Sequence, residues 1–277
     1  MIYRIPSDIN TSIIGTENAS PQTTSLASTG NVGFTNAFTP KKASGNVVGI
    51  KFFLTLSATS GSVAGSTTVG SSITEFKIRK GSDIYLNAQN FAQLQRVYHM
   101  ITGLSMSDVT LTGTANGTAT ATLETPIIPF HYTLDQPIYI EFQFTSYTAL
   151  SSDFTGASVS GYVVFYYGNV AENDKFIINT LPTALNSNTD IDIFDYFSDK
   201  SPIKYFWLDV SADSNLNYME FEVGTLKIRD KMYATALTQF EDYFDSVFTH
   251  INGFFLTPLP YGVLATPSGS NVSAPKL

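Results

Sequence analysis

The stretch Ile138-Tyr139-Ile140-Glu141-Phe142-Gln143-Phe144-Thr145 decides the fold class, because its side chains alternate without a break. Every second residue is large and apolar, and the residues between them are polar or amphipathic. Successive side chains of a β-strand point to opposite faces of a sheet, so a period of two is typical of a strand with one buried face. A helix would repeat its apolar residues every three or four positions. The stretch therefore predicts a strand that borders a packed core.

Similar alternation elsewhere predicts that the chain is all-β. Further strands are expected at residues 47–57, 75–79, 159–167 and 203–210. Residues 109–123 are predicted to form a hairpin, because Thr/Leu/Ala alternation continues on both sides of Asn116-Gly117. The positive φ angles that this dipeptide tolerates suit a type I′ turn.

Composition divides the chain into an arm and two domains. Residues 1–32 hold Ser, Thr, Asn and Gly with few large apolar residues, which is typical of an extended arm, and we expect the core to begin after it. Gly168 and the polar run Ala171-Glu172-Asn173-Asp174 mark the best domain boundary. We therefore predict one barrel at residues 33–168 and a second at residues 169–277.

Each half contains a strand, a short linker and a helix in the same order. Glu220-Phe221-Glu222-Val223 mirrors Glu75-Phe76-Lys77-Ile78 at a spacing of 145 residues. Helices are predicted at about residues 82–101, begun by Ser82 or Asn87, and at about residues 230–250, with an apolar stripe that includes Phe240. The shared order favours a duplicated barrel. The alternative is two unrelated β-domains with a short chance similarity.

Composition also indicates a surface poor in charge. Charged residues make up 14% of the 277 residues, against about 25% in ordinary soluble domains. The net charge of −8 argues against direct sequence-specific nucleic-acid binding, because phosphate neutralisation needs clustered Lys and Arg. The two small basic clusters, Lys41-Lys42 and Lys77-Arg79-Lys80, are expected to be solvated faces or strand ends. Such a surface suits a protein that buries its flanks against copies of itself.

Neither metal-binding nor catalytic motifs stand out. The three histidines, His99, His131 and His250, are far apart and match no ligand spacing, and the chain has no cysteine. It contains neither a G-x-S-x-G nucleophile elbow nor a phosphate-binding glycine loop. No apolar run approaches the ~18 residues of a membrane-spanning helix. We expect no enzymatic activity, no cofactor, and no catalytic or metal site.

One acidic concentration leaves two readings open. It consists of Asn188, Asp190, Asp192, Asp195 and Asp199. Alternate positions could turn oxygen ligands toward a cation such as calcium. The segment Asp190-Ile191-Asp192-Ile193 equally fits a strand with one solvated face.

Four motifs follow one another in the C-terminal part of the chain. They are Glu220-Phe221-Glu222-Val223-Gly224-Thr225, Tyr243-Phe244, Phe254-Phe255-Leu256-Thr257-Pro258-Leu259, and Pro267-Ser268-Gly269-Ser270-Asn271-Val272-Ser273. Their order resembles the second barrel of double-jelly-roll major capsid proteins, a lineage of nucleocytoplasmic large DNA viruses, virophages and membrane-containing icosahedral phages. The resemblance covers residues 219–273 well and the first half only through its fold pattern. Thr266 and Ala274 depart from it, because the family often has Gln and Arg there.

The resemblance implies two tandem jelly-roll barrels, each with a short helix insertion. It also implies a structural protein of the virion, a homotrimer that forms pseudo-hexagonal capsomers of an icosahedral shell. Its implied partners are neighbouring capsomers, minor capsid or penton proteins, and an internal viral membrane. The alternative function is a β-sandwich spike or a carbohydrate- or receptor-binding module, since exposed Tyr/Asn/Ser loops suit recognition as well.

The second barrel is expected to be incomplete. Family members continue through several strands past the last motif, whereas 26 residues follow Ile251, enough for about two strands. Its closing strands would then come from a longer natural chain, from the arm at residues 1–32, or from a neighbouring subunit.

Overall fold

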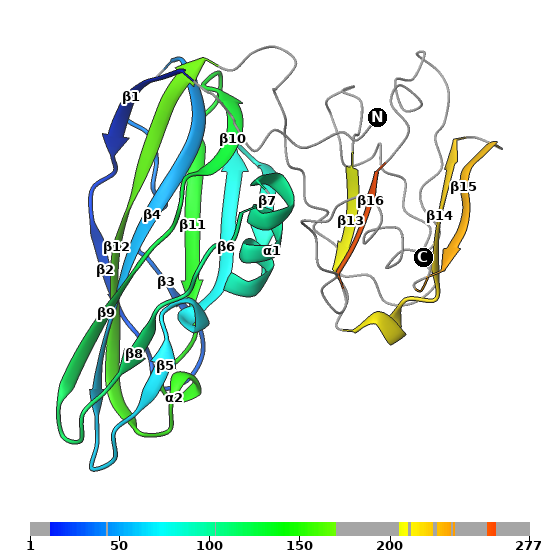
Figure 1. The fold of residues 1–277 in the computed structure, drawn as a ribbon. Coiled ribbons are helices and arrows are strands. Elements are labelled where there is room, and N and C mark those ends of the chain that lie inside the picture. Colours follow the sequence, from blue (N-terminus) through cyan, green and yellow to red (C-terminus); the bar gives the residue numbers. More distant parts are fainter. Residues whose placement is uncertain are drawn as a thin grey trace. The chain divides into compact units, whose positions relative to one another are not determined.

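The computed structural model describes residues 12–42, 44–102, 104–169, 205–209, 212–223, 226–233, 235 and 254–258. The chain divides into two compact units, one of residues 3–180 and one of residues 181–277 together with residues 1–2. Figure 1 shows the layered strands of the first unit and the separate strand pairs of the second. The predicted boundary at residue 168 falls at the end of the last strand of the first unit, and residues 170–204 lie outside the described part.

The first unit is built around a six-stranded antiparallel sheet, here called the large sheet. Its two longest strands, β4 (Asn46–Ser60) and β12 (Phe154–Asn169), pair with each other along most of their length. On the side away from β4, β12 pairs with β1 (Ser12–Asn18) and β2 (Gln22–Ser25). On the side away from β12, β4 pairs with β9 (Thr118–Glu124) and β10 (Ile128–Thr133).

A four-stranded small sheet forms the second layer. Its strands, in spatial order, are β3 (Val32–Gly33), β11 (Ile138–Phe144), β6 (Ile73–Lys80) and β7 (Asp83–Ala88). We leave out β5 and β8, which form a separate two-stranded sheet, and count β1 with β2 and β9 with β10 as one strand each; the large sheet then has the chain order first, eighth, third, sixth. The small sheet has the order second, seventh, fourth, fifth. This arrangement is the topology of a jelly roll.

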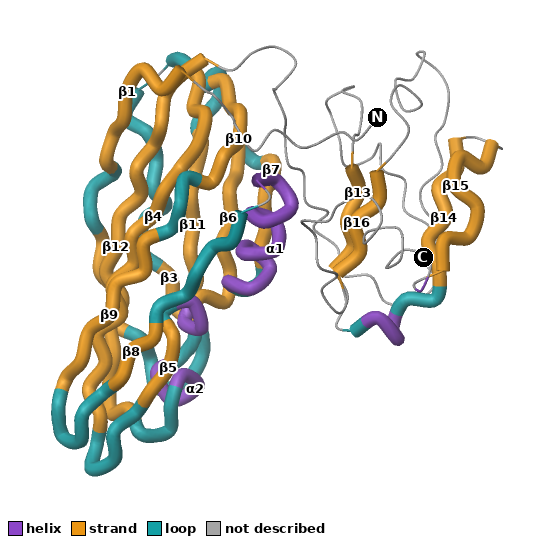
Figure 2. Tube along the Cα trace, in the orientation of Figure 1, coloured by secondary structure: helices purple, strands orange, loops and turns teal. Residues whose placement is uncertain are grey.

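Shorter elements flank the two sheets (Figure 2). The helix α1 (Phe91–Thr102) follows β7 and lies against β6 and β7. At the opposite end of the unit, β5 (Ser66–Thr68) pairs with β8 (Thr110–Thr112), near the single-turn helix α2 (Tyr147–Leu150). Among the described residues, no helix is long and apolar enough to cross a membrane.

The core lies between the two sheets and is rich in phenylalanine. Phe52 of β4 meets Phe76 of β6 and Phe142 of β11, with ring centroids 5.4 and 5.0 Å from that of Phe52. Phe52 and Phe76 are completely buried. Burial of one such side chain stabilises the fold by about 1.5–3 kcal/mol, and each aromatic pair adds about 0.5–1.5 kcal/mol. The strands predicted from alternation at residues 47–57, 75–79, 138–145 and 159–167 are confirmed as β4, β6, β11 and β12.

The packed fold begins earlier than the sequence suggested. Residues 12–25, which were expected to belong to an arm outside the core, form β1 and β2 of the large sheet. Ala19 and Leu26, which follow these strands, are each only 5% exposed. Both strands lie at a sheet edge, where backbone hydrogen bonds to β12 hold them and few large apolar side chains are needed. A composition-based prediction therefore missed them.

The first predicted helix starts later than residue 82. Residues 83–88 form β7, which pairs with β6, and the helix begins at Phe91. Asn90 caps it, because its Oδ1 accepts a hydrogen bond of 2.9 Å from the backbone N–H of Gln93. Neither Ser82 nor Asn87 starts the helix. Ile84, Leu86 and Ala88 alternate as in a strand, and the pairing with β6 decides the outcome.

The predicted hairpin at residues 109–123 is wrong in its pairing. Strands do lie on both sides of Asn116-Gly117, but β8 pairs with β5 and β9 pairs with β4. Asn116 has a φ of 54°, whereas Gly117 is not in the positive-φ region, so the turn is not type I′. The Gly117 N–H instead donates to the Thr114 carbonyl at 3.0 Å.

The second unit is described through two strand pairs. Strand β13 (Tyr205–Asp209) pairs with β16 (Phe254–Pro258), and β14 (Tyr218–Val223) pairs with β15 (Leu226–Tyr233). A 3₁₀ turn at Asp213–Asn215 precedes β14. The strand predicted at residues 203–210 corresponds to β13.

The repeated strand predicted from the sequence extends to a pair of strands in each unit. Strands β6 and β14 begin at Ile73 and Tyr218, 145 residues apart, and their partners β7 and β15 end at Ala88 and Tyr233, again 145 residues apart. The helix α1 follows β7, and Thr235, just after β15, is helical. The same backbone path in both units supports duplication of one barrel.

Some predictions for the second unit lie outside the described residues. Residues 230–233 of the expected helix belong to β15, and apart from Thr235 the rest of it, including Phe240, is not described. The acidic concentration at residues 188–199 is not described either. The closure of the second barrel stays a prediction.

Candidate functional surfaces

The histidines and acidic residues form no metal centre in the described part of the chain. No group of three or more His, Cys, Asp or Glu side chains converges there. His99 lies on α1 with its Nδ1 3.2 Å from the Leu104 carbonyl oxygen, and His131 lies on β10 and is half-buried. His250 lies outside the described residues. The candidate functional features considered next are the surfaces of the first unit.

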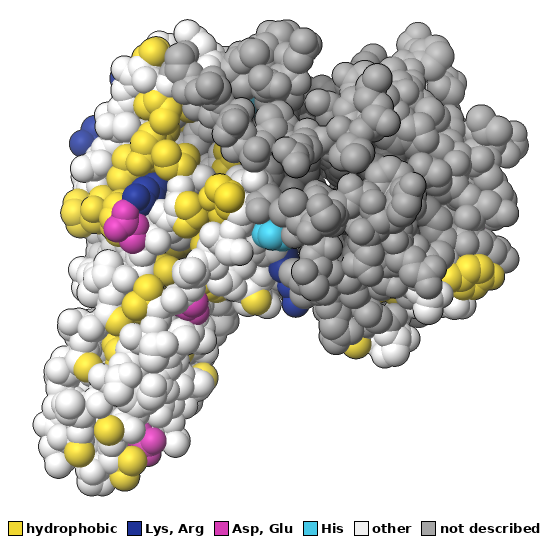
Figure 3. Space-filling model, viewed as in Figure 1, with side chains coloured by type: hydrophobic (Ala, Val, Ile, Leu, Met, Phe, Trp, Pro, Cys, Tyr) yellow, Lys and Arg dark blue, Asp and Glu magenta, His cyan; other side chains and the backbone are white. Residues whose placement is uncertain are grey.

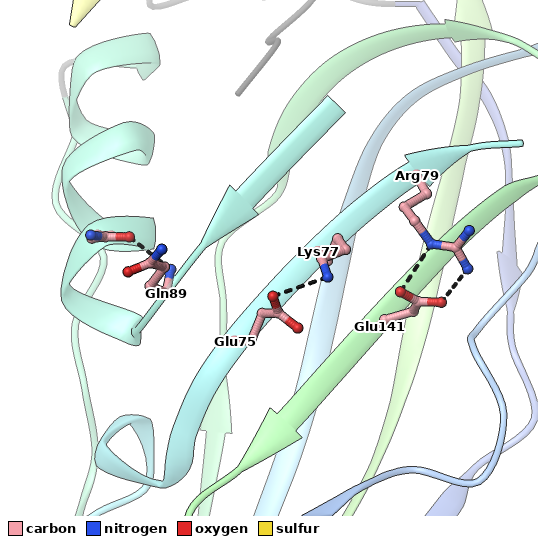
Figure 4. A network of polar contacts seen from close by, with 6 residues as sticks. Glu75, Lys77, Arg79, Gln89 and Glu141 are labelled. Carbon is pink, nitrogen blue, oxygen red and sulfur yellow. Dashed lines mark hydrogen bonds and ion pairs between the residues drawn. The ribbon is translucent and has the colours of Figure 1, made fainter. Parts of the chain in front are cut away.

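The outer face of the small sheet carries a network of charged side chains (Figure 4). Arg79 of β6 donates from Nε to Glu141 of β11 at 3.0 Å and makes a second bond from Nη2 to the other carboxylate oxygen. Beside it, Lys77 lies 3.0 Å from Glu75. The hydrogen bond with Glu141 raises the pKa of Arg79, so this pair stays ionised. Lys77 and Arg79 of the basic cluster are thus neutralised within their own sheet, and Lys80 pairs with Asp135 in the turn before β11, as expected for a solvated face.

Side chains of β1 and β12 also interact at the β1 edge of the large sheet. The Glu17 carboxylate of β1 accepts from the Tyr167 hydroxyl at 2.8 Å and from the Lys41 backbone N–H at 2.6 Å. Burial, with Glu17 close by, raises the pKa of Tyr167. The Lys42 ammonium lies 4.2 Å from the centre of the Tyr167 ring. Residues 41 and 42 thus tie the segment before β4 to the sheet edge.

Regularly spaced hydroxyl groups cover the outer face of the large sheet toward the Ser60 end of β4. Strand pairing aligns one Ser or Thr from each of β9, β4, β12 and β2 in two adjacent rows. We call this set the hydroxyl rows: Thr120, Ser57, Ser158 and Ser25, and Thr122, Thr55, Ser160 and Thr23. Thr55 and Thr122 bond through their hydroxyls at 2.9 Å, as Thr59 and Thr118 do just below at 2.8 Å.

Beyond the hydroxyl rows, toward the start of β4, the same face becomes aromatic. Phe53 stacks on Tyr162 of β12, with ring centroids 4.7 Å apart and planes only 11° from parallel. Lys51, whose ammonium lies 5.1 Å from the Phe53 ring centre, forms an ion pair with Glu124 of β9. Figure 3 shows apolar side chains gathered around one basic and one acidic group, with mostly uncharged side chains toward the far end. Lys51 and Glu124 cancel, so the described part of this face has no net charge.

Loops at that far end are tied together by backbone hydrogen bonds. Gly61 donates to the Asp153 carbonyl and Ser60 to the Gly117 carbonyl, and Asn116 donates back to the Gly61 carbonyl at 2.6 Å. Three loops that are distant in sequence are therefore ordered as one tip. Asp153 is its only charged residue within residues 61–65, 113–117 and 151–153.

Sequence reasoning found β4 and β12, the two longest strands of the large sheet, but missed the hydroxyl rows. The alternation Thr118-Ala119-Thr120-Ala121-Thr122 was visible, yet it was assigned to a local hairpin. The rows arise only when β9 pairs with β4 and β12 pairs with β2. Those registers depend on long-range contacts, which composition does not report.

Comparison with solved structures shows the fold of the whole chain. The chain is similar to the STIV MCP (major capsid protein) crystal structure, with a TM-score of 0.55 at 14% identity, over 95% of this chain and 91% of that one. It also matches a quasi-atomic model of the PBCV-1 virus capsid, with a TM-score of 0.49 at 9% identity over 96% and 84% of the two chains. For the major capsid protein P2 from bacteriophage PM2 the values are 0.47, 10%, 95% and 90%. No protein-family model and no curated protein matches the sequence. The likeness to the STIV protein, together with the strand order above, identifies the fold as the double jelly roll of major capsid proteins.

Proposed function

From this double-jelly-roll fold, we propose that the chain is the major capsid protein of an icosahedral virus and is located in the virion shell. Three copies associate into a pseudo-hexagonal capsomer, because two similar barrels per chain give six barrels in a closed three-fold ring. Neighbouring capsomers, minor capsid or penton proteins, and an internal viral membrane are its partners. The role is structural, with no catalysis and no sequence-specific contact to nucleic acid.

The repeated pair of strands is the observation that carries this proposal. Its 145-residue spacing gives one such pair in each unit, β6 with β7 and β14 with β15, and the first unit has complete jelly-roll topology. A single binding module does not need a second barrel. A pseudo-hexagonal capsomer of three subunits has six barrels only when each subunit contributes two. The similarity to the STIV protein along nearly the whole chain supports the same arrangement.

Surface chemistry supports it as well. Charged side chains on the described outer faces are paired within the unit, as in Arg79–Glu141 and Lys51–Glu124. Paired or absent charge lowers the desolvation cost when surfaces are buried between subunits. A protein that worked as a soluble monomer would gain solubility from unpaired charge.

Native mass spectrometry of the purified full-length chain tests the proposal. We expect a homotrimer of about 91 kDa, three times the 30.2 kDa of one chain, and electron micrographs in which the trimers form hexagonal arrays or closed shells. A stable monomer that binds a glycan or receptor and never forms arrays would refute it. That outcome would favour the spike or binding-module function.

A further inference from the structure

We propose that the outer face of the large sheet is a contact surface on which a second copy of this chain docks face to face, about a two-fold axis. The face comprises the hydroxyl rows and, above them, Phe53, Tyr162 and the Lys51–Glu124 pair. This inference rests on the proposed shell function and goes beyond it, because it assigns contacts between copies to one sheet of the first unit.

Charge self-complementarity identifies the occupant. Lys51 on β4 and Glu124 on β9 are neighbours on the face, with side chains 22% and 56% exposed. A two-fold axis that lies in the plane of the contact, between these two side chains, brings Lys51 of one copy toward Glu124 of the other, twice. The chain as a whole carries a net charge of −8, whereas the described part of this face carries none. Two copies of this face therefore meet without repulsion between like charges, and their Lys51 and Glu124 side chains are complementary.

The hydroxyl rows suit a partner of the same kind. A hydroxyl both donates and accepts, so a row of Ser and Thr satisfies an identical row. Short side chains also lose less conformational freedom on burial than Lys, Arg or Glu would. The surface of a soluble monomer usually carries many charged side chains, whereas the eight hydroxyl residues in register carry none.

The available area is large enough for a stable contact. Four strands at about 4.8 Å spacing make the face about 19 Å wide, and the ten residue steps from Gly49 to Thr59 make it about 34 Å long. The product, about 650 Å² for each copy, approaches the ~800 Å² that each partner contributes to a standard interface. The small sheet is the weaker candidate, because its charged side chains form a hydrated network and α1 lies beside it.

Charge variants test the pairing between copies. Lys51→Glu leaves two acidic groups on each face, and Glu124→Lys leaves two basic groups, so each variant alone should need at least a tenfold higher concentration than the wild type to form arrays. An equimolar mixture of the two variants should assemble at close to the wild-type concentration, because acidic faces meet basic ones. Local disruption inside one chain is not repaired by mixing. If each variant assembled like the wild type, or if the mixture failed to recover, the assignment would be overturned.

Single cysteines locate the contact directly, because the chain has none of its own. The two-fold axis that exchanges Lys51 with Glu124 passes close to Phe53, because Phe53 lies opposite Glu124 in the sheet. With Phe53→Cys, mild oxidation of assembled particles should therefore give a disulfide-linked dimer. Gln143→Cys, exposed on the outer side of β11, is the matched control and should stay monomeric on a non-reducing gel. Dimers from the Gln143 variant and none from the Phe53 variant would move the contact to the small sheet. Assembly of the wild-type chain tests the shell function separately. If the wild-type chain assembles, the shell function stands whatever the cross-linking shows. If it stays a monomer, the shell function itself fails.

Discussion

Replacement of Phe52 by alanine tests the central packing of the first barrel. Phe52 of the large sheet is 0% exposed and touches two rings of the small sheet, those of Phe76 and Phe142. A buried Phe→Ala change costs about 3–5 kcal/mol, from lost transfer free energy and from the cavity left behind. Since each 1.4 kcal/mol is a factor of ten, amides that exchange through unfolding of this unit should exchange about 100 to 4,000 times faster.

Hydrogen exchange with mass spectrometry of the full-length chain measures this effect. Peptides from β4 and β12 report the first unit, while fluorescence of Trp207, the only tryptophan, reports the second unit and should not change. Phe53→Ala is the matched control, because the same atoms are removed one position along on the outer face. It loses the stacking on Tyr162, about 0.5–1.5 kcal/mol, and the contact of its ring with the Lys51 ammonium, about 0.5–1 kcal/mol. Equal effects of the two substitutions, or a larger one for Phe53, would contradict the inward and outward assignment of β4.

Two further predictions concern backbone fit and pH. A Cβ on Gly161 of β12 would lie 2.5 Å from Leu54 Cδ2, so Gly161→Ala should destabilise the first unit by about 1–3 kcal/mol, whereas Gly156→Ala, with nothing within 4 Å, should change thermal stability by less than about 0.5 kcal/mol. Melting temperatures decide this, and equal values for both variants would refute the strand packing. The hydrogen bond from Lys80 lowers the pKa of Asp135, so its stabilisation is present above the unfolded-state value of about 3.9 and is lost as the pH falls through the lower folded-state value. Asp135→Asn should therefore flatten the decline in melting temperature between about pH 4 and pH 2. The effect should be small, because the Asp135 side chain is 57% exposed. A pH profile identical to that of the wild type would show that this ion pair does not stabilise the fold.

Local periodicity was enough to predict the strands that have one buried face. In β4 and β11, inward Phe and Ile alternate with outward polar residues, so each strand carries its own assignment. Strands β1 and β2 carry no such pattern, because they lie at an edge and are held mainly by backbone bonds to β12. Their presence depends on a partner that lies more than 130 residues away in the sequence.

Competition between neighbouring signals explains the misplaced helix start. The helix stripe of Phe91, Leu94 and Tyr98 is genuine, but the six residues of β7 before it also alternate. In the sequence, residues 83–88 fit both the start of a helix and a strand. Pairing with β6 makes them a strand. The outer-face surface was harder still to predict, because it is a property of registers between four strands rather than of any one of them.

The central place of β12 has a consequence for synthesis. It is the last strand of the first unit to leave the ribosome, yet it pairs with β1, β2 and β4, which emerge more than a hundred residues earlier. Until β12 arrives, one long edge of β4 and all of β1 and β2 lack their neighbour. Contacts so distant in sequence form slowly, and unpaired edges invite pairing with other nascent chains. Many chains translated at once should therefore expose unpaired strand edges to one another, and the yield of folded subunits should rise when fewer chains are translated at the same time or when chaperones cover those edges.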